Sequence, residues 1–174
     1  MTGFAPYDPD ASRMDVPILA VVREATPDDL DPLTAFELTT VSRTRGDWEA
    51  VIEQSLADDD RLFLVAEVAG DVAAFGQAHF LPMHPVNHSP PGFYLTGVTV
   101  QPSYRRGGLG RQLTVARLDW IRERADAAWY FASSANQPSI DLHSAFGFVE
   151  VSRARTIHGV TFDAGEGVLF RAEL

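Results

Sequence analysis

The sequence predicts a mixed α/β domain of three layers, in which helices cover both faces of a mixed sheet. Short apolar runs with strand composition alternate along the chain with segments of helical periodicity. The run 127–133 is apolar up to its final serine, which is typical of a strand in the middle of a sheet. The chain has 174 residues, of which 45% are hydrophobic, so it can form one domain with a substantial core.

The first half of the chain contains the signals for one strand, two helices and a β-hairpin. Thr26 is a preferred N-cap residue, and Pro27 suits the first helical position, where a backbone N–H has no intrahelical partner. Gly70 marks a tight turn between two strands. The expected elements are a strand at 18–24, a helix from Thr26 to about Arg43, a helix from about Asp47 to Leu56, and strands at 61–67 and 72–80.

The second half alternates strands with helices after a loop at 81–91 that contains four prolines. A helix is expected from Gly108 to about Ala125, because apolar residues recur along it at helical spacing. Its apolar face is expected to contain Leu109, Leu113, Val115, Leu118 and Ile121. The remaining expected elements are strands at 95–100, 127–133, 148–157 and 167–172 and a helix within 136–147.

The segment from Val98 to Leu113 carries the clearest functional signal. It has the pattern of a strand, an exit marked by Pro102, a turn rich in arginine and glycine, and the start of a helix. Glycine lets the main chain approach a ligand closely and adopt positive φ. The free N–H groups of the turn and of the helix start then converge on one point, with the helix dipole behind them. Such an arrangement binds anions and suits a pyrophosphate.

The spacing of the glycines distinguishes between the known phosphate-binding motifs. A P-loop requires a lysine, and the chain contains none. The dinucleotide motif Gly-x-Gly-x-x-Gly fails, because its third glycine, counted from Gly108, falls on Leu113. The remaining pattern, Arg105-x-x-Gly108-x-Gly110, resembles the pyrophosphate-binding signature of the GNAT superfamily of acyl-CoA-dependent N-acyltransferases.

A second segment strengthens this resemblance. Asn136 to Phe148 is similar to the family's Asn…Tyr-x-x-x-Gly-Phe stretch, and the two segments have the family's order and spacing. The resemblance covers residues 17–174, and residues 1–16 are expected to form a flexible leader. It implies a GNAT-like, mostly antiparallel sheet, in which the strands at 95–100 and 127–133 start side by side and then splay apart to admit the pantetheine arm.

The resemblance also implies acetyl-CoA as cosubstrate and direct transfer of its acetyl group to an amine. Main-chain N–H groups around Val98 to Val100 are expected to bind the thioester oxygen, because a splayed strand leaves ladder donors unpaired. The residues expected to bind the cofactor are Val98, Thr99, Val100, Arg105, Arg106, Gly107, Gly108, Leu109, Gly110, Arg111, Asn136 and His143.

The base that accepts the amine proton is not fixed by the pattern. Tyr94 stands where many family members carry a glutamate, so a water relay or another residue is expected to act instead. The alternatives are Glu24, His79, His84 and His88, each of which also has a structural or solvent-exposed interpretation. We single out His88, because it is a loop histidine expected near the acceptor entrance and histidine is a common general base. Tyr94 is kept as a second candidate.

His143 is the candidate general acid for the departing thiolate. It occupies the position at which the family often has a tyrosine, four residues before the glycine of Gly147-Phe148. A histidine there can donate a proton to the thiolate or hydrogen-bond the sulfur. It can also serve as a packing residue only, because the CoA thiolate is a good leaving group near neutral pH.

Composition limits the partners. The chain has no cysteine and 14 arginines, and its loop histidines lack the spacing of a metal site, so no metal is expected. Residues 105–124 carry six arginines against two acids, a local charge of +4, which leaves −14 on the rest of a chain of net charge −10. The basic segment suits a phosphate-rich cofactor. The acidic remainder disfavours nucleic acid and favours a cationic amine, or it only keeps the surface solvated.

The sequence therefore predicts an N-acetyltransferase that acetylates a primary amine of a small molecule, either amino-acid-like or aminoglycoside-like. Two alternatives stay open: an acetyltransferase of protein N-termini, and a non-catalytic acyl-CoA sensor, since both the family glutamate and the family tyrosine are replaced. No apolar run has the roughly 20 residues of a membrane span, no signal peptide is recognised, and a cytoplasmic location is expected. The sequence leaves a homodimer open.

Overall fold

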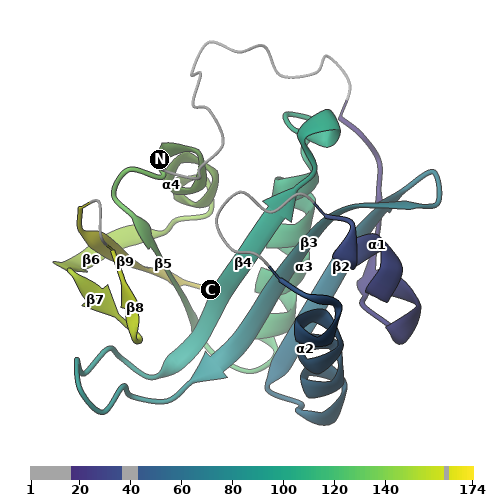
Figure 1. The fold of residues 1–174 in the computed structure, drawn as a ribbon. Coiled ribbons are helices and arrows are strands. Elements are labelled where there is room, and N and C mark those ends of the chain that lie inside the picture. The colour runs from purple at the N-terminus through teal and green to yellow at the C-terminus, as the bar shows by residue number, and fades with distance from the viewer. Residues whose placement is uncertain (1–16, 37–42, 163–164) are drawn as a thin grey trace.

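The computed structural model describes residues 17–36, 43–162 and 165–174. Its main feature is a seven-stranded sheet in the order β1-β2-β3-β4-β5-β9-β6 (Figure 1). Neighbouring strands are antiparallel except for β4 and β5, which run parallel. The prediction of a mixed, mostly antiparallel sheet is confirmed. The strands are β1 (Val21–Glu24), β2 (Arg61–Val68), β3 (Asp71–Leu81), β4 (Gly92–Val100), β5 (Ala127–Ser133), β6 (Val149–Ala154) and β9 (Gly167–Glu173).

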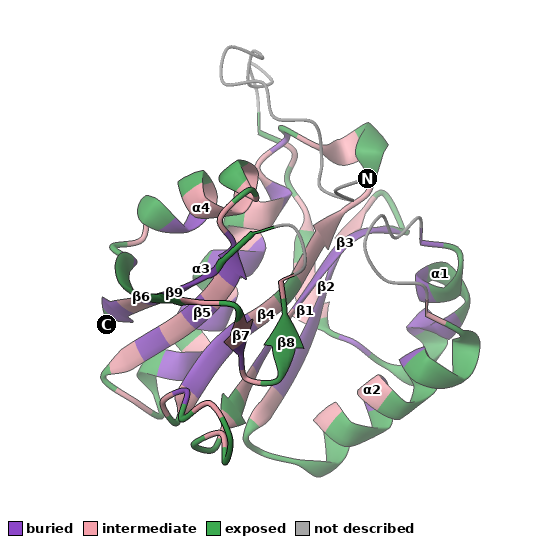
Figure 2. Cartoon of the chain, turned by 60° about the vertical axis from the view of Figure 1, so that its left-hand side comes forward, coloured by how far each residue is buried: buried purple, intermediate pink, exposed green. Residues whose placement is uncertain are grey.

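Helices cover both faces of this sheet, as Figures 1 and 2 show. The buried residues of α3 join one core cluster with Leu62 and Leu64 of β2. Those of α1 and α2 join a second cluster with Phe63 and Val65 of the same strand. Because successive side chains of a strand point to opposite faces, the two clusters lie on opposite sides. The helices are α1 (Leu30–Thr34), α2 (Arg45–Ala57), α3 (Leu109–Arg122) and α4 (Gln137–Ser144), with 3₁₀ turns η1 (Pro27–Asp29) and η2 (Pro102–Tyr104).

Three helix predictions need correction. The helix expected to reach Arg43 ends at Thr34, whose hydroxyl donates to the Leu30 carbonyl and so competes with the helical backbone pattern; residues 37–42 lie outside the described part. The second helix starts earlier than expected, because Thr44 caps it. Val115 is 40% exposed rather than part of the apolar face of α3. It follows Leu113 by two residues, about 200° around the helix, so it faces solvent.

Two strand predictions also need correction. Residues 18–20 leave the sheet: Ile18 N–H donates to the Gly107 carbonyl (2.9 Å), and the Gln112 side chain donates to the Ile18 carbonyl (2.7 Å). This segment therefore supports the glycine-rich loop. The strand expected at 148–157 divides after Ala154 into β6 and a small hairpin, β7 (Thr156–Ile157) and β8 (Val160–Thr161). His158 and Gly159 both have positive φ, the geometry of a two-residue hairpin turn.

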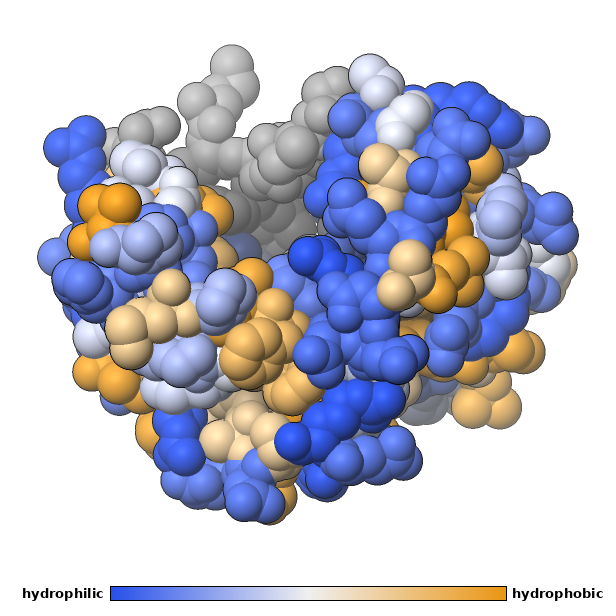
Figure 3. Space-filling model, turned by 90° about the horizontal axis from the view of Figure 1, so that it is seen from below, coloured by the Kyte–Doolittle hydropathy of each residue, from blue (hydrophilic) through white to orange (hydrophobic). Residues whose placement is uncertain are grey.

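The face of the molecule seen from below is mostly polar, with scattered apolar patches (Figure 3). Seen from below, hydrophilic residues surround patches of limited size (Figure 3). Phe80, Met83 and Val86 are among the exposed large apolar residues, and they lie at the end of β3 and in the loop that follows. Within the described ranges, no helix is long and apolar enough to cross a membrane.

Candidate active site

The sheet opens between its two parallel strands. β4 and β5 pair only at Phe93 with Ala128 and at Tyr94 with Trp129. Beyond these pairs the two ribbons diverge toward the end of the molecule where α4 and the start of α3 lie (Figure 1). From Leu95 onward, the backbone groups of β4 that face β5 have no strand to bond, so the predicted splay is confirmed and leaves polar main chain along one wall.

A β-bulge shapes that wall. β3 advances by two residues between Phe75 and Gln77, whereas β4 advances by three between their partners Thr99 and Thr96. Gly97 lies inside the bulge with φ of +55°, a left-handed conformation that favours glycine. The bulge turns Val98 away from regular pairing just where the strand has lost β5. Sequence reasoning missed this feature, although an isolated glycine in a strand is a recognised bulge signal.

The glycine-rich loop ends at a helix whose first turn has no side-chain cap. Gly108 is the N-cap of α3, has φ of +85°, and brings no side chain to the first N–H groups of the helix. These groups have no intrahelical acceptors, so they and the helix dipole remain directed at whatever lies in front of α3. The local geometry is that of an anion site.

The other glycines of the loop have different neighbours. A Cβ on Gly107 would lie 2.5 Å from Ile18 Cδ1, so Gly107 is required for packing against the segment before β1. A Cβ on Gly110 would lie 3.4 Å from Leu142 of α4 and 3.9 Å from Val100 of β4. Gly110 thus lies between the end of β4 and α4, at the mouth of the opening.

The basic segment is smaller than predicted. Arg105, Arg106 and Arg111 lie at the loop, and Arg105 Nε donates to the Val100 carbonyl at 3.2 Å. Arg122 and Arg124 lie at the far end of α3, about 20 Å away at 1.5 Å per residue, and Arg117 is buried. A charge summed along the sequence therefore overstated the positive charge in front of the loop.

The second predicted segment lies across the opening. Asn136 caps α4, and its side-chain oxygen accepts from Ser139 N–H at 3.4 Å. Leu142 of α4 lies close to Gly110, so α4 adjoins the glycine-rich loop. Among the described residues, none accepts a hydrogen bond from the Asn136 amide NH₂ group. That group is therefore available to a ligand.

His143 lies inside the protein on α4, with only 2% of its surface exposed. Its Nδ1 is 2.8 Å from the Ser139 carbonyl. Because a carbonyl only accepts, Nδ1 carries the hydrogen and Nε2 presents a lone pair. Burial, together with the charge of Arg117, lowers the pKa of His143 to about 4, so the ring is neutral at neutral pH.

Sequence reasoning missed Tyr130, which stacks on His143 with 4.1 Å between ring centroids. Within the described residues, the buried Tyr130 hydroxyl and His143 Nε2 have no hydrogen-bond partner. The two residues come from β5 and α4, so only the folded chain brings them together. They form a polar pair within an otherwise apolar cluster.

The candidate bases are dispersed. Tyr94 is buried, its hydroxyl donates to the Pro90 carbonyl at 2.8 Å, and burial raises the pKa of its phenol. His88 is exposed in the loop after β3, with φ of +54°. Glu24 lies on β1, three strands from β4, a separation of about 14 Å. His84 Nδ1 accepts from backbone N–H groups of its own loop. The sequence alone did not show which of these residues lie near the opening and which lie far from it.

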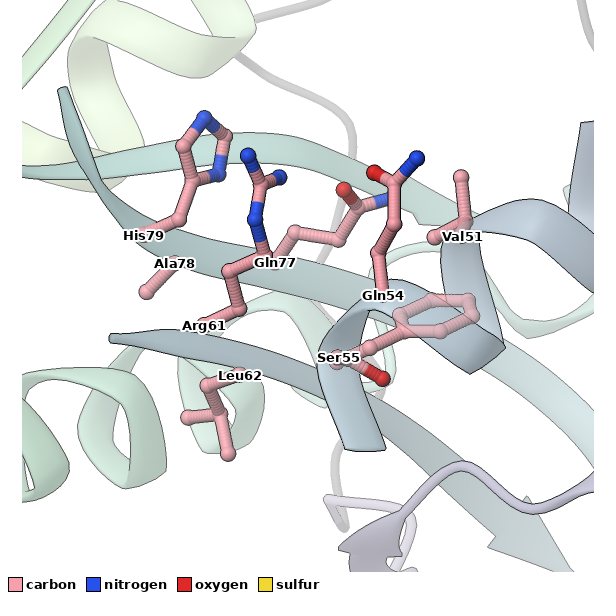
Figure 4. Close-up of a pocket in the computed structure, with 9 residues that line it drawn as sticks. Val51, Gln54, Ser55, Arg61, Leu62, Gln77, Ala78 and His79 are labelled. Atoms are coloured by element: carbon pink, nitrogen blue, oxygen red, sulfur yellow. The ribbon is translucent and has the colours of Figure 1, made fainter. Parts of the chain in front are cut away.

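His79 is nearer to the splayed strand. It lies opposite Tyr94, and its Nδ1 is 3.3 Å from the hydroxyl of Thr96, directly before the bulge. Burial, and secondly the charge of Arg61, lowers the pKa of His79 to about 4. His79 also lines a small pocket between α2 and the sheet, with Val51, Gln54, Ser55, Arg61, Leu62, Phe63, Gln77 and Ala78. Figure 4 shows His79, Arg61 and Gln54 extending to the same side.

Comparison with known proteins agrees with this architecture. Residues 28–148 match the acetyltransferase (GNAT) family, and the chain belongs to that family of acyltransferases. A curated relative, the mycothiol acetyltransferase of Pseudarthrobacter chlorophenolicus, is 29% identical over 111 residues, which are 62% of this chain and 33% of the relative. The chain spans about a third of the length of the curated relatives it matches.

Solved structures share the fold. The ribosomal-protein-alanine N-acetyltransferase of Brucella melitensis is 26% identical, with a TM-score of 0.68 over 88% of this chain and 99% of that one. An acetyltransferase-like protein of Salmonella typhimurium, whose structure contains its cofactor acetyl-CoA, is 21% identical, with a TM-score of 0.67 over 90% and 94%. The predicted family and fold are therefore confirmed.

Proposed function

We propose that the protein is an acetyl-CoA-dependent N-acetyltransferase that acts on a primary amine of a small molecule. One observation carries the proposal: the unpaired wall of β4 and the uncapped start of α3 adjoin the same opening, next to α4. An elongated ligand with an anionic end matches this combination. In acetyl-CoA the flexible pantetheine arm joins the pyrophosphate to the thioester, so a site that binds both the pyrophosphate and the arm positions the thioester.

The residues predicted to bind the cofactor fit such a ligand. Gly108, Leu109, Gly110 and Arg111 offer the N–H groups of the first turn of α3 to the pyrophosphate. Arg105 and Arg106 add positive charge, while Gly107 allows the loop to pack. Asn136 offers its free amide NH₂ group to the pantetheine arm, and Val98, Thr99 and Val100 belong to the stretch of β4 that has no β5 partner.

The chemistry requires an oxyanion donor and a path for one proton. A main-chain N–H of the bulge at Val98 is our proposed donor to the thioester oxygen. The attacking amine loses a proton and the thiolate gains one. His143 stays our candidate general acid for the departing thiolate; because its ring is neutral at neutral pH, Nε2 must first take up a proton before it can donate one. Tyr94 and His88 stay weaker candidates: Tyr94 is bonded to Pro90, and His88 lies in an outer loop.

The pocket beside His79 favours an amino-acid-like acceptor over an aminoglycoside. Its charged lining residue is Arg61, whose Nε is paired with Asp58 at 3.1 Å, and its other polar side chains are neutral. A carboxylate next to the amine would complement Arg61, whereas a polycation would be repelled by it. The overall acidity of the chain acts only at longer range. The expected cytoplasmic location and a homodimer stay predictions.

An amine panel separates the alternatives. The protein is incubated with acetyl-CoA and amino acids, aminoglycosides or peptides with N-terminal alanine, and the released thiol is measured. We expect release with small amino-acid-like amines. Release with peptides alone would favour the N-terminal acetyltransferase, which the Brucella likeness supports. Tight CoA binding without release from any amine would favour an acyl-CoA sensor.

A further inference from the structure

Arg117 is a buried cation in the middle of α3, with 0% of its surface exposed. No carboxylate of the described residues forms an ion pair with it, and burial lowers the pKa of its guanidinium to about 9. It is therefore charged at neutral pH. Burying a charge without an ionic partner is costly, and an apolar residue of similar volume is often at least as stabilising. Stability alone therefore does not explain a buried arginine at this position.

The guanidinium holds both sides of the β4 bulge. Nη1 donates to the Gln77 carbonyl of β3 at 3.1 Å and to the Thr96 carbonyl of β4 at 3.4 Å. Gln77 and Thr96 are the pair at which the strand register changes. Arg117 thereby fixes the peptide that immediately precedes Gly97 and Val98.

The same Arg117 side chain is also linked to the first turn of α3, which follows the glycine-rich loop. Its Nη2 donates to the Thr114 hydroxyl at 3.0 Å, and that hydroxyl donates to the Gly110 carbonyl at 2.8 Å. A chain of three hydrogen bonds, Thr114 to Gly110, Arg117 to Thr114 and Arg117 to Thr96, therefore joins the first turn of α3 to the bulge. The buried Arg117 side chain therefore links the start of α3, where we expect the pyrophosphate, to the β4 bulge, where we expect the thioester.

Gly76 makes room for this group. A Cβ at Gly76 would lie 3.2 Å from Arg117 Nε and 3.3 Å from Cζ, tighter than ordinary packing. The sequence thus combines a buried arginine on α3 with a missing side chain on β3. This pairing offers a second way to disturb the guanidinium without removing it.

The charge of Arg117 affects His143 of α4. It is the second cause, after burial, of the lowered pKa of His143 on α4. A cation that disfavours a positive ring at α4 favours negative charge at a similar distance from it. Both the thioester oxygen and the departing sulfur acquire negative charge during acyl transfer.

We infer that Arg117 is a positioning residue of the acyl-transfer site, which fixes the β4 bulge and stabilises the CoA thiolate by its charge. The inference rests on the proposed function. This role differs from that of the glycine-rich loop, which would contact the cofactor directly. Arg117 would act indirectly, through its hydrogen bonds to main-chain carbonyls and through its positive charge.

The test uses free CoA, so it does not depend on knowing the amine. The thiol of bound CoA is titrated by the ultraviolet absorbance of its thiolate in the wild type, Arg117→Met and Arg117→Lys. Arg122→Met, at the exposed end of the same helix, is the matched control. We expect Arg117→Met to raise the thiol pKa by about 1 and Arg117→Lys to recover part of the difference. The control should match the wild type.

Turnover provides the second readout. With an amine acceptor in hand, Arg117→Met should lower kcat about 10-fold or more at nearly unchanged KM for acetyl-CoA. An unchanged thiol pKa in folded Arg117→Met would overturn the inference while leaving the proposed function intact. Failure of the wild type to bind CoA would overturn both. If Arg117→Met does not fold, Arg117→Gln, which keeps a hydrogen-bond donor without the charge, decides in the same assay: a raised thiol pKa supports the inference, and an unchanged one contradicts it.

Discussion

Tyr94 and Trp129 form the last parallel pair between β4 and β5, and their rings stack with centroids 6.0 Å apart. The Tyr94 hydroxyl is tied to the Pro90 carbonyl, and Trp129 packs so closely over Gly92 that a Cβ there would lie 2.7 Å from the indole. The point where the two strands part is therefore a packed aromatic contact. The opening beyond it is a fixed property of the fold.

This geometry predicts that Tyr94→Phe affects stability more than catalysis. Removing the hydroxyl deletes one hydrogen bond, so the free energy of unfolding should fall by about 1 kcal/mol, measured by urea denaturation. Turnover should change little, because the phenol is bonded to Pro90 and its raised pKa keeps it protonated. A loss of turnover near 10²-fold in a folded variant would instead assign Tyr94 to proton transfer.

Gly108→Asp should abolish CoA binding. The new carboxylate would lie at the N-terminus of α3, in the space and field that the pyrophosphate needs. The positive φ of Gly108 also strains any replacement, by roughly 1 kcal/mol. Gly108→Ala has the same strain without the charge, so it is the matched control and should retain measurable affinity. Calorimetry that finds equal CoA affinity in wild type and folded Gly108→Asp would refute the pyrophosphate assignment.

Much of this site could be predicted from local sequence, because its parts are local. Gly108 at a helix start and Asn136 before Pro138 are signals within a few residues, and both lie at helix N-caps as expected. Arg117 shows the limit. It follows Leu113 by four residues and precedes Ile121 by four, so helical periodicity places it on the buried face, but a count of charges treats it as surface.

Contacts between distant elements could not be predicted in the same way. Tyr130 and His143 are joined only when α4 folds against β5, and the pairing of Gly76 with Arg117 spans β3 and α3. Residues 18–20 had strand composition, yet they hydrogen-bond to the loop and to Gln112. In each case the position of the residue depends on a partner from a distant part of the chain. The periodicity of a single helix or strand does not reveal that partner.

The lowered pKa of His143 predicts a loss of stability in mild acid. The unfolded chain binds a proton near pH 6.5 and the folded chain only near 4, so stabilisation is complete above 6.5 and is lost as pH falls toward 4. At pH 5 the loss from this residue is on the order of 2 kcal/mol. His79 has a similarly lowered pKa, so the wild type should lose more than this in total.

A variant isolates the share of His143. Urea denaturation at pH 7 and pH 5 should show a smaller difference for His143→Phe than for the wild type, because the phenylalanine cannot be protonated. The lowered pKa of the Asp29 carboxyl confines its contribution to more acidic solutions. Equal pH dependence in both proteins would show that the buried ring takes up its proton without cost to folding.

The same variant tests the catalytic role of His143. His143→Phe retains a flat ring for the contacts with Tyr130 and Phe148, so CoA affinity should be kept. If Nε2 takes the amine proton and returns it to the sulfur, turnover should fall by about 10²-fold where thiolate departure limits the rate. His143→Tyr, which restores the residue more common in the family, should recover part of that loss. A phenylalanine variant with wild-type turnover from pH 6 to pH 9 would mean that His143 only packs and that the thiolate leaves unaided.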